Sequence, residues 1–302
     1  MPKIKYKDKK IGAERLKIIA TANSILDEYR AQGFQLTLRQ LYYKFVARDI
    51  IPNNMREYKL LGQIINDGRL CGLIDWNAIT DMTRNLQSVS HWTDPSEIVS
   101  AVANQFRIDK WSTQKVRPEV WIEKDAMASI VEGICRQLDV AYFSCRGYTS
   151  QSEMWAGAMR LRGYARNGQK PLILHFGDHD PSGMDMTRDI TERMEMFAGG
   201  ITIDRLALNW DQIEEYAPPP NPAKEGDSRS KAYIEEFGDS SWELDALEPS
   251  VVVDLIRTTV ESVRDEDAWQ EKVSEENEHR RLLKKASDRW DNVVEFLEQA
   301  EE

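Results

Sequence analysis

The segment PLILHFGDHDPSG, residues 171–183, decides the fold that we predict for this chain. Its first half is a short apolar run typical of a β-strand, and the polar half contains Asp178 and Asp180. A strand that turns sharply through Asp-x-Asp-Pro-Ser-Gly directs two carboxylates into one small volume. Ligands of open parallel sheets bind beyond the carboxyl ends of the strands, so we expect a binding site at this turn.

The alternation of strand and helix continues on both sides of this segment. Short apolar strands alternate with amphipathic helices, which predicts an α/β domain with a doubly wound, Rossmann-like parallel sheet over residues 113–216. The predicted strands are PEVWIE (118–123), VAYFSC (140–145), PLILHF (171–176) and ITIDRLAL (201–208). The predicted helices between them are 125–138, 151–166 and 182–198.

The N-terminal part of the chain has a helical pattern instead. The apolar pattern predicts an amphipathic helix in three segments: residues 11–32, the segment that starts after a Thr37 N-cap, and residues 55–70. GLIDWNAITD (72–81) reads as a short strand and turn. Three helices and a β wing predict a winged-helix DNA-binding domain over residues 1–112.

The C-terminal part begins with a segment that has no apolar period. APPPNPAKEGDSRS (217–230) is rich in proline and small polar residues, which predicts a long loop. Two acidic helices are expected after it. We assign residues 217–302 to a segment that completes the α/β domain.

The composition indicates a cytoplasmic protein with no membrane partner. The 302 residues contain no apolar stretch long enough to cross a bilayer and no signal-peptide pattern. The cysteines, Cys71, Cys135 and Cys145, lack the spacing of a zinc site or a disulfide framework. We therefore expect three reduced thiols.

Charge is distributed unevenly along the chain, whose formal net charge is -11. Residues 1–119 contain 19 Lys and Arg against 13 Asp and Glu, a net charge of +6. Residues 225–302 contain 10 against 23, a net charge of -13. A basic N-terminal part in an acidic chain indicates a nucleic-acid-binding module joined to a second module.

Glu123 is a third carboxylate at the predicted sheet edge, because it ends the strand PEVWIE. A cation would relieve the repulsion between Glu123, Asp178 and Asp180, and an all-oxygen ligand set indicates Mg²⁺. A calcium loop is an alternative for Asp-x-Asp, but Pro181 and Asp189 stand at unsuitable positions. A phosphatase-type aspartyl nucleophile is a second alternative for Asp-x-Asp. Such a nucleophile should follow the first strand of the domain, and this alternative leaves Glu123 unexplained.

Two motifs together resemble a known family. GDHDPSG (177–183) resembles the D-x-D-P-x-G motif of the topoisomerase VI A subunit and the related meiotic double-strand-break transesterase. TLRQLYY (37–43) resembles their R-x-x-Y-Y motif, and SCRGYTS (144–150) and ELDALEP (243–249) are similar to two further segments. The order also agrees, because in that family a winged helix precedes a Toprim domain, whose sheet edge holds a Glu and an Asp-x-Asp.

The resemblance spans residues 35–250 and implies a short, stand-alone DNA-cleaving enzyme. In that family the tyrosine of one subunit works with the Toprim site of another, which implies a homodimer that makes staggered double-strand breaks. Glu123 would bind Mg²⁺ with the two aspartates and carry a proton to the leaving sugar oxygen. The chain departs from the family in its length, in Thr149 and Ser150 where the family has Pro-Asp, and in having no phenylalanine at the position where the family pattern leads us to expect one after the tyrosines.

The helical pattern separates the two adjacent tyrosines. Tyr42 falls on the apolar stripe with Leu41 and Phe45, so we expect it in the core. Tyr43 lies one position round the helix, outside the stripe, with Arg39 beside it on the same surface. We predict that Tyr43 is an exposed nucleophile and that Arg39 stabilises phosphate charge and favours the phenolate. A hydroxyl that only contacts a DNA phosphate is the alternative.

Three functions follow from these patterns. The first is Mg²⁺-dependent transesterification of DNA by Tyr43, the second is a Toprim-type endonuclease in which water attacks, and the third is non-catalytic DNA binding. Each function requires double-stranded DNA, and the predicted DNA contacts are Arg39, Lys44, Arg56, Lys59, Arg69 and Arg146. The chain has no GxxxxGK[ST] motif, so ATP-driven strand passage would need a separate ATPase partner.

Overall fold

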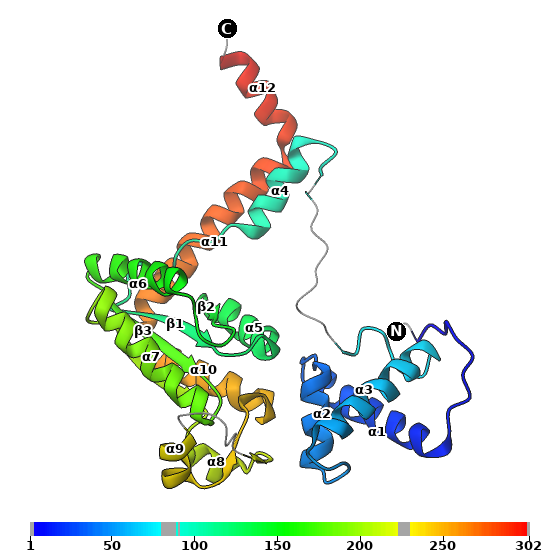
Figure 1. Ribbon diagram of the computed structural model, residues 1–302. Helices are drawn as coiled ribbons and strands as arrows, with labels where there is room; N and C mark the ends of the chain where they lie inside the picture. The colour runs from blue at the N-terminus through cyan, green and yellow to red at the C-terminus, as the bar shows by residue number, and fades with distance from the viewer. Residues whose placement is uncertain (1–2, 80–88, 90, 223–229, 301–302) are drawn as a thin grey trace. The chain divides into compact units, whose positions relative to one another are not determined.

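The computed structural model describes residues 3–79, 89, 91–222 and 230–300 of a mixed α/β protein (Figure 1). The chain forms two compact units. The first contains Met1–Arg84 and Pro118–Glu261, and the second contains Asn85–Arg117 and Ser262–Glu302. These units do not coincide with the predicted segments 1–112, 113–216 and 217–302, because the N-terminal helices share a unit with the sheet, whereas residues 262–302 group with 85–117.

The three N-terminal helices that the apolar pattern predicts are present. They are α1 (Ala13–Ala31), α2 (Leu38–Ala47) and α3 (Met55–Leu70). Thr37 caps α2 as predicted: its hydroxyl accepts a hydrogen bond from the backbone N–H of Gln40, and the Gln40 side chain accepts one from the backbone N–H of Thr37. This capping box fixes the start of the helix that carries both tyrosines.

The predicted β wing does not appear in the described part of the chain. Residues 72–79 form no strand there, and the pairing near them consists of two isolated bridges, Lys5 to Cys71 and Leu36 to Ile79. The last two residues of the predicted strand and turn, 80 and 81, lie outside the described residues. A helical N-terminal region is therefore established, and its winged-helix character remains an interpretation.

A four-stranded parallel sheet follows, with the strand order β2-β1-β3-β4. Its strands are β1 (Val116–Ile122), β2 (Ala141–Ser144), β3 (Lys170–Phe176) and β4 (Thr202–Ala207). The intervening helices are η1 (Asp125–Met127), α5 (Ala128–Leu138), α6 (Gln151–Arg166) and α7 (Pro181–Phe197). Each lies where the alternating pattern predicts it, so the α/β prediction is confirmed.

The sheet and its helices share a tightly packed core. Trp121 of β1, Ile173 of β3 and Met194 of α7 are fully buried there. Gly157 lets α6 approach this core, because a Cβ atom at that position would lie 3.1 Å from the Trp121 ring. This packing fixes the carboxyl ends of β1 and β3, which carry the predicted acidic residues.

The chain after the sheet contains several short elements. They are α8 (Trp210–Tyr216), β5 (Asn221–Pro222), α9 (Ser230–Phe237), β6 (Ser240–Ser241), η2 (Leu244–Ala246) and α10 (Pro249–Ser262). Part of the predicted loop at 217–230 pairs as β5 with β6, and residues 223–229 lie outside the described residues. η2 packs against α2, which brings residues about 200 positions apart into contact.

The second unit is helical. α4 (Pro95–Gln105) and α11 (Glu266–Asp288) lie side by side, and α12 (Trp290–Ala300) follows (Figure 1). An ion pair of 2.6 Å between Lys110 and Glu276 links the two parts of this unit. Two helices were predicted after the loop at 217–230, and the described chain there has four α-helices, α9 to α12.

None of the helices in the described ranges combines the length and the apolar character that a bilayer span requires.

Candidate functional site

The candidate site is built from segments that are distant in sequence. α2 contributes a basic side chain, the end of β1 contributes one basic and one acidic side chain, and the turn after β3 and the segment 243–248 contribute acidic ones. The charged members are Arg39, Glu123, Lys124, Asp178, Glu243 and Asp245.

Glu243 lies at the centre of this cluster. Its two carboxylate oxygens lie 2.7 and 2.5 Å from Nη2 of Arg39, and Oε2 also accepts a hydrogen bond of 2.8 Å from Lys124. Burial acts to raise the pKa of Glu243, but Lys124 and Arg39 lower it below its usual value. Glu243 is therefore an ionised carboxylate held between two cations.

Lys124 joins this carboxylate to the turn after β3. Its Nζ lies 2.5 Å from Oδ2 of Asp178, whose Oδ1 accepts a hydrogen bond of 2.8 Å from the Leu244 N–H. Burial acts to lower the pKa of Lys124, but Asp178, Asp245 and Glu243 outweigh it and raise the pKa. The ammonium group stays protonated and neutralises part of the acidic cluster.

Asp245 is the most deeply buried carboxylate of the cluster, with a relative exposure of 0%. Arg39 Nε lies 3.3 Å from its Oδ2, and neither side-chain oxygen accepts a hydrogen bond within the described part of the chain. Burial raises the pKa of Asp245 to about 7. This carboxyl can therefore exchange a proton near neutral pH.

The predicted exposure of Tyr43 is wrong. Tyr43 and Tyr42 are both buried, at 3% and 4% exposure. The helical stripe predicts the burial of Tyr42 correctly, but residues 243–248 cover the side of α2 that carries Tyr43, and Ala246 joins the N-terminal core. The apolar periodicity of a single helix cannot predict that a segment distant in sequence packs against its second side.

The two phenol groups have different partners. Tyr42 donates a hydrogen bond of 2.9 Å to Oδ1 of Asn53. The Tyr43 oxygen lies 3.5 Å from Nη2 of Arg39 and 3.5 Å from Nδ2 of Asn221. Arg39 therefore stands beside Tyr43 as predicted, and the long contacts leave the phenol loosely held.

The expected phenolate is not favoured in this arrangement. Burial, followed by the negative charges of Asp245 and Glu243, raises the pKa of Tyr43 to about 12, although Asn221 and Arg39 act to lower it. The phenol is therefore neutral at physiological pH. It could attack phosphorus only if a base accepted its proton.

A pocket of about 280 Å³ adjoins these groups. Arg39, Tyr43, Asn53, Asn221 and Glu243 are among the residues that line it. The pocket gives a solute access to the guanidinium and the phenol, even though both tyrosine rings are largely covered.

The three predicted metal ligands are not brought together as a set. Asp178 binds Lys124, and Asp180 caps α7 by accepting a hydrogen bond of 2.7 Å from the Gly183 N–H. Glu123 Oε2 instead accepts a hydrogen bond of 2.9 Å from the backbone N–H of Asp178. Within the described residues no group of three His, Cys, Asp or Glu side chains could hold a metal ion.

The donor chemistry of these carboxylates still matches Mg²⁺, because all three offer oxygen atoms. Burial, followed by the negative charge of Asp178, raises the pKa of Glu123 to about 7, so a cation at this site would favour its ionised form. In this arrangement, however, the cation beside Asp178 is Lys124. The residues as placed here do not fit a shared Mg²⁺ ion.

Two of the predicted DNA contacts are internal. Lys44 has a relative exposure of 2% and pairs with Glu248 at 2.9 Å. The Arg69 guanidinium donates hydrogen bonds to the backbone oxygens of Trp76 and Ile79. Lys44 therefore stabilises the fold from inside, and the half-buried Arg69 uses one guanidinium nitrogen to hold the segment after α3.

The other predicted DNA contacts reach solvent. Arg56 and Lys59 are exposed on α3 and line a surface pocket of about 510 Å³. Arg146 is exposed and pairs with Asp125 at 2.8 Å. Arg39 is 40% exposed at its side chain, where Glu243 binds it.

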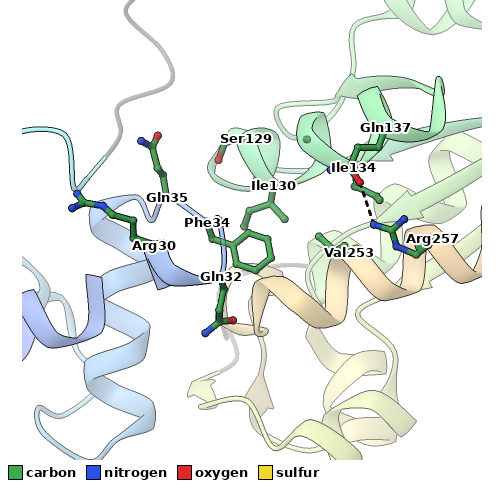
Figure 2. A pocket seen from close by; sticks show the side chains of 12 residues that line it. Arg30, Gln32, Phe34, Gln35, Ser129, Ile130, Ile134, Gln137, Val253 and Arg257 are labelled. Carbon is green, nitrogen blue, oxygen red and sulfur yellow. Dashed lines mark hydrogen bonds between the residues drawn. The ribbon is translucent and has the colours of Figure 1, made fainter. Parts of the chain in front are cut away.

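A larger pocket, of about 650 Å³, lies elsewhere in the first unit (Figure 2). Phe34, Ile130, Ile134 and Val253 give it an apolar lining, and Arg257 donates a hydrogen bond of 3.2 Å to Gln137 at its edge. None of the predicted catalytic or metal-binding residues lines it, so its size does not make it the candidate site.

The structure adds Lys124, Asn221, Glu243 and Asp245 to the residues that the sequence predicts. Two signals point to three of them: Lys124 directly follows Glu123, and ELDALEP contains both added carboxylates. A comparison with models of known protein families finds none that matches this chain, and a search of curated proteins finds no match either. The function is therefore argued from the site itself.

Proposed function

We propose that this protein cleaves DNA by transesterification, with Tyr43 as the nucleophile. One observation carries the proposal: the Tyr43 oxygen lies 3.5 Å from Nη2 of Arg39 at the wall of a pocket of about 280 Å³. A phenol beside a guanidinium in an accessible pocket suits attack on a phosphodiester, because the cation stabilises the charge that develops on phosphorus. The resemblance of TLRQLYY and GDHDPSG to the topoisomerase VI A family supports the same reaction.

The proposed step breaks one ester bond and forms another. The Tyr43 oxygen bonds to phosphorus while the bond from phosphorus to the leaving sugar oxygen breaks. A base accepts the phenolic proton, and Glu123, whose pKa is raised to about 7, is our candidate donor of the proton that the leaving oxygen gains. Asp245 is our candidate base, because its pKa of about 7 suits proton transfer and its charge is the largest carboxylate influence on the pKa of Tyr43.

Mg²⁺ remains part of the proposal only through the family resemblance. A bound Mg²⁺ ion supplies charge stabilisation to phosphoryl transfer. Glu123, Asp178 and Asp180 would hold it only if Lys124 left Asp178, so no step above depends on it. The resemblance also supports a homodimer acting on double-stranded DNA.

A nuclease in which water attacks is the second candidate. The observation that favours it is the burial of Tyr43 with a pKa of about 12, which opposes its activation. The nuclease would leave no protein on the DNA. A covalent link between protein and DNA therefore separates the two reactions.

The test uses supercoiled plasmid, the full chain and Mg²⁺, followed by denaturation with detergent. Transesterification predicts broken DNA with protein attached to its ends in the wild type and in Tyr42→Phe, and neither product in Tyr43→Phe. Breaks without attached protein, equally in all three proteins, would replace the transesterase with the nuclease. DNA that is bound but unbroken would leave the non-catalytic alternative.

A further inference from the structure

The Glu243 carboxylate has the surroundings of a bound phosphate. A guanidinium, an ammonium and an amide converge on it: Arg39 at 2.7 and 2.5 Å, Lys124 at 2.8 Å and Asn221 Nδ2 at 3.5 Å. Arginine and lysine bind phosphate oxygens through the same charge-assisted hydrogen bonds that they make to carboxylates. The donors around Glu243 would therefore suit an entering phosphate group.

These donors are accessible to a solute. Arg39, Asn221 and Glu243 line the pocket beside Tyr43, and the Lys124 side chain retains 26% of its exposure. The Glu243 side chain is 22% exposed. An anion can therefore approach the cluster from the pocket without unfolding of the core.

The backbone beside Glu243 is anchored independently of its side chain. The Leu244 N–H donates to Asp178, and Trp242 exchanges two backbone hydrogen bonds with His179, at 2.8 and 2.9 Å. A side-chain rotation of Glu243 would thus free the donors while the chain stays in place. A phosphodiester and a carboxylate each carry one negative charge, so Arg39 and Lys124 would face the same charge after the exchange.

We propose that Arg39, Lys124 and Asn221 form a phosphate-binding site and that Glu243 occupies it in the free protein as an internal substitute for a DNA phosphate. The identity of the ligand as a DNA phosphodiester rests on the proposed function, whereas the site itself rests on the contacts around Glu243. DNA must displace this carboxylate before its phosphorus can meet Tyr43. Glu243 therefore restrains the site until DNA binds.

The effect of Glu243 on the apparent affinity for phosphate can be measured. A ligand that binds only the open form loses apparent affinity in proportion to the fraction of protein that is open. If Glu243 filled the site in about nine molecules of ten, its removal would raise phosphate affinity about tenfold. We expect a gain of at least about threefold in Glu243→Gln.

The first experiment measures stabilisation by inorganic phosphate at constant ionic strength. The melting temperature of the full chain is followed as phosphate replaces chloride in wild type, Glu243→Gln and Glu236→Gln. Glu236 is exposed on α9, so its variant makes the same charge change outside the site. Half of the stabilisation should need at least about threefold less phosphate in Glu243→Gln, and Glu236→Gln should follow the wild type.

The second experiment tests whether the gain in phosphate affinity in Glu243→Gln arises at the proposed site. Adding Lys124→Gln to Glu243→Gln should abolish it, because the site loses one of its two cations. Equal phosphate dependence in Glu243→Gln and Glu236→Gln, or a gain that survives Lys124→Gln, would overturn the proposal. If Glu243→Gln does not fold, Glu243→Asp is measured in its place, since a carboxylate shorter by one methylene should still give a smaller gain.

The last arm uses a fluorescent DNA duplex in EDTA and measures anisotropy. Glu243→Gln should bind it at least about threefold more tightly than Glu236→Gln. A gain for inorganic phosphate without a gain for DNA would leave an anion site that does not serve DNA and would overturn the assignment of Glu243 as a DNA substitute. Failure of Tyr43 to become attached to DNA would remove the transesterase and leave the phosphate result intact, so the two failures are distinguishable.

Discussion

Replacing each of the two tyrosines by phenylalanine should distinguish the hydroxyl that stabilises the fold from the hydroxyl that takes part in the proposed reaction. The Tyr42 hydroxyl donates to Asn53 at 2.9 Å and lies 3.2 Å from the backbone oxygen of Asn54. Tyr42→Phe removes this bonding and leaves the Asn53 oxygen short of a donor. A net loss of about 1 to 2 kcal/mol in the free energy of unfolding follows.

Tyr43→Phe should cost far less. Both contacts of its hydroxyl are 3.5 Å long, at the limit of a hydrogen bond. Loss of the hydroxyl also removes a buried polar group that is poorly satisfied. We expect a change of less than about 0.5 kcal/mol in either direction.

Urea unfolding of both variants and the wild type measures the difference. Circular dichroism and tryptophan fluorescence should give coincident midpoints, because only then does a midpoint report one transition. A loss of stability in Tyr43→Phe that equals or exceeds the loss in Tyr42→Phe would refute the reasoning. It would mean that Tyr43 is held as a structural residue and that loss of activity in its variant says nothing about chemistry.

Three further predictions concern packing, pH and DNA contacts. Gly183→Ala should destabilise the protein by about 2 kcal/mol or more in the same urea assay, because the new Cβ would lie 2.2 Å from a backbone oxygen. Gly133→Ala, where no atom lies within 4 Å of the new Cβ, should raise stability by about 0.5 kcal/mol. Equal effects of the two substitutions would contradict this packing argument. The raised pKa of Glu123, about 7, means that the folded protein holds its proton more tightly than the unfolded chain, so the free energy of unfolding should fall as pH rises from about 4.5 to 7. Glu123→Gln should flatten that fall, and an unchanged pH profile would remove the assigned cause. Arg56→Gln and Lys59→Gln should each reduce the slope of log affinity for duplex DNA against log salt by about 0.9, whereas unaltered slopes would place DNA elsewhere.

Local patterns predict the local structure of this chain well. The Thr37 cap, the bounds of α6 at 151–166 and the four strands of the sheet all follow from residues within a few positions of one another. Apolar periodicity and capping are short-range properties, and a sheet edge follows from the strand ends. Arg39 and Tyr43 likewise lie side by side because helical geometry places them four residues apart.

Contacts between distant segments escape the same reasoning. The burial of Tyr43 and Lys44 depends on residues 243–248, and the apolar periodicity of α2 does not predict this contact. The pairing of Lys124 with Asp178 joins the end of β1 to the turn after β3, and no local pattern places this lysine beside that carboxylate. Sequence alone predicts an acidic edge, and the structure shows how the protein balances its charge.

Mapping the protein atom that becomes attached to DNA tests the central claim most directly. The protein is incubated with duplex DNA and Mg²⁺, denatured and treated with nuclease and trypsin, and its peptides are analysed by mass spectrometry. Cleavage after Arg39 and Lys44 places both tyrosines in the peptide 40–44, QLYYK, where fragmentation between them distinguishes the two. A nucleotide mass on Tyr43 is the predicted result, and a nucleotide on Tyr42, or cleaved DNA with no modified peptide, would contradict the account.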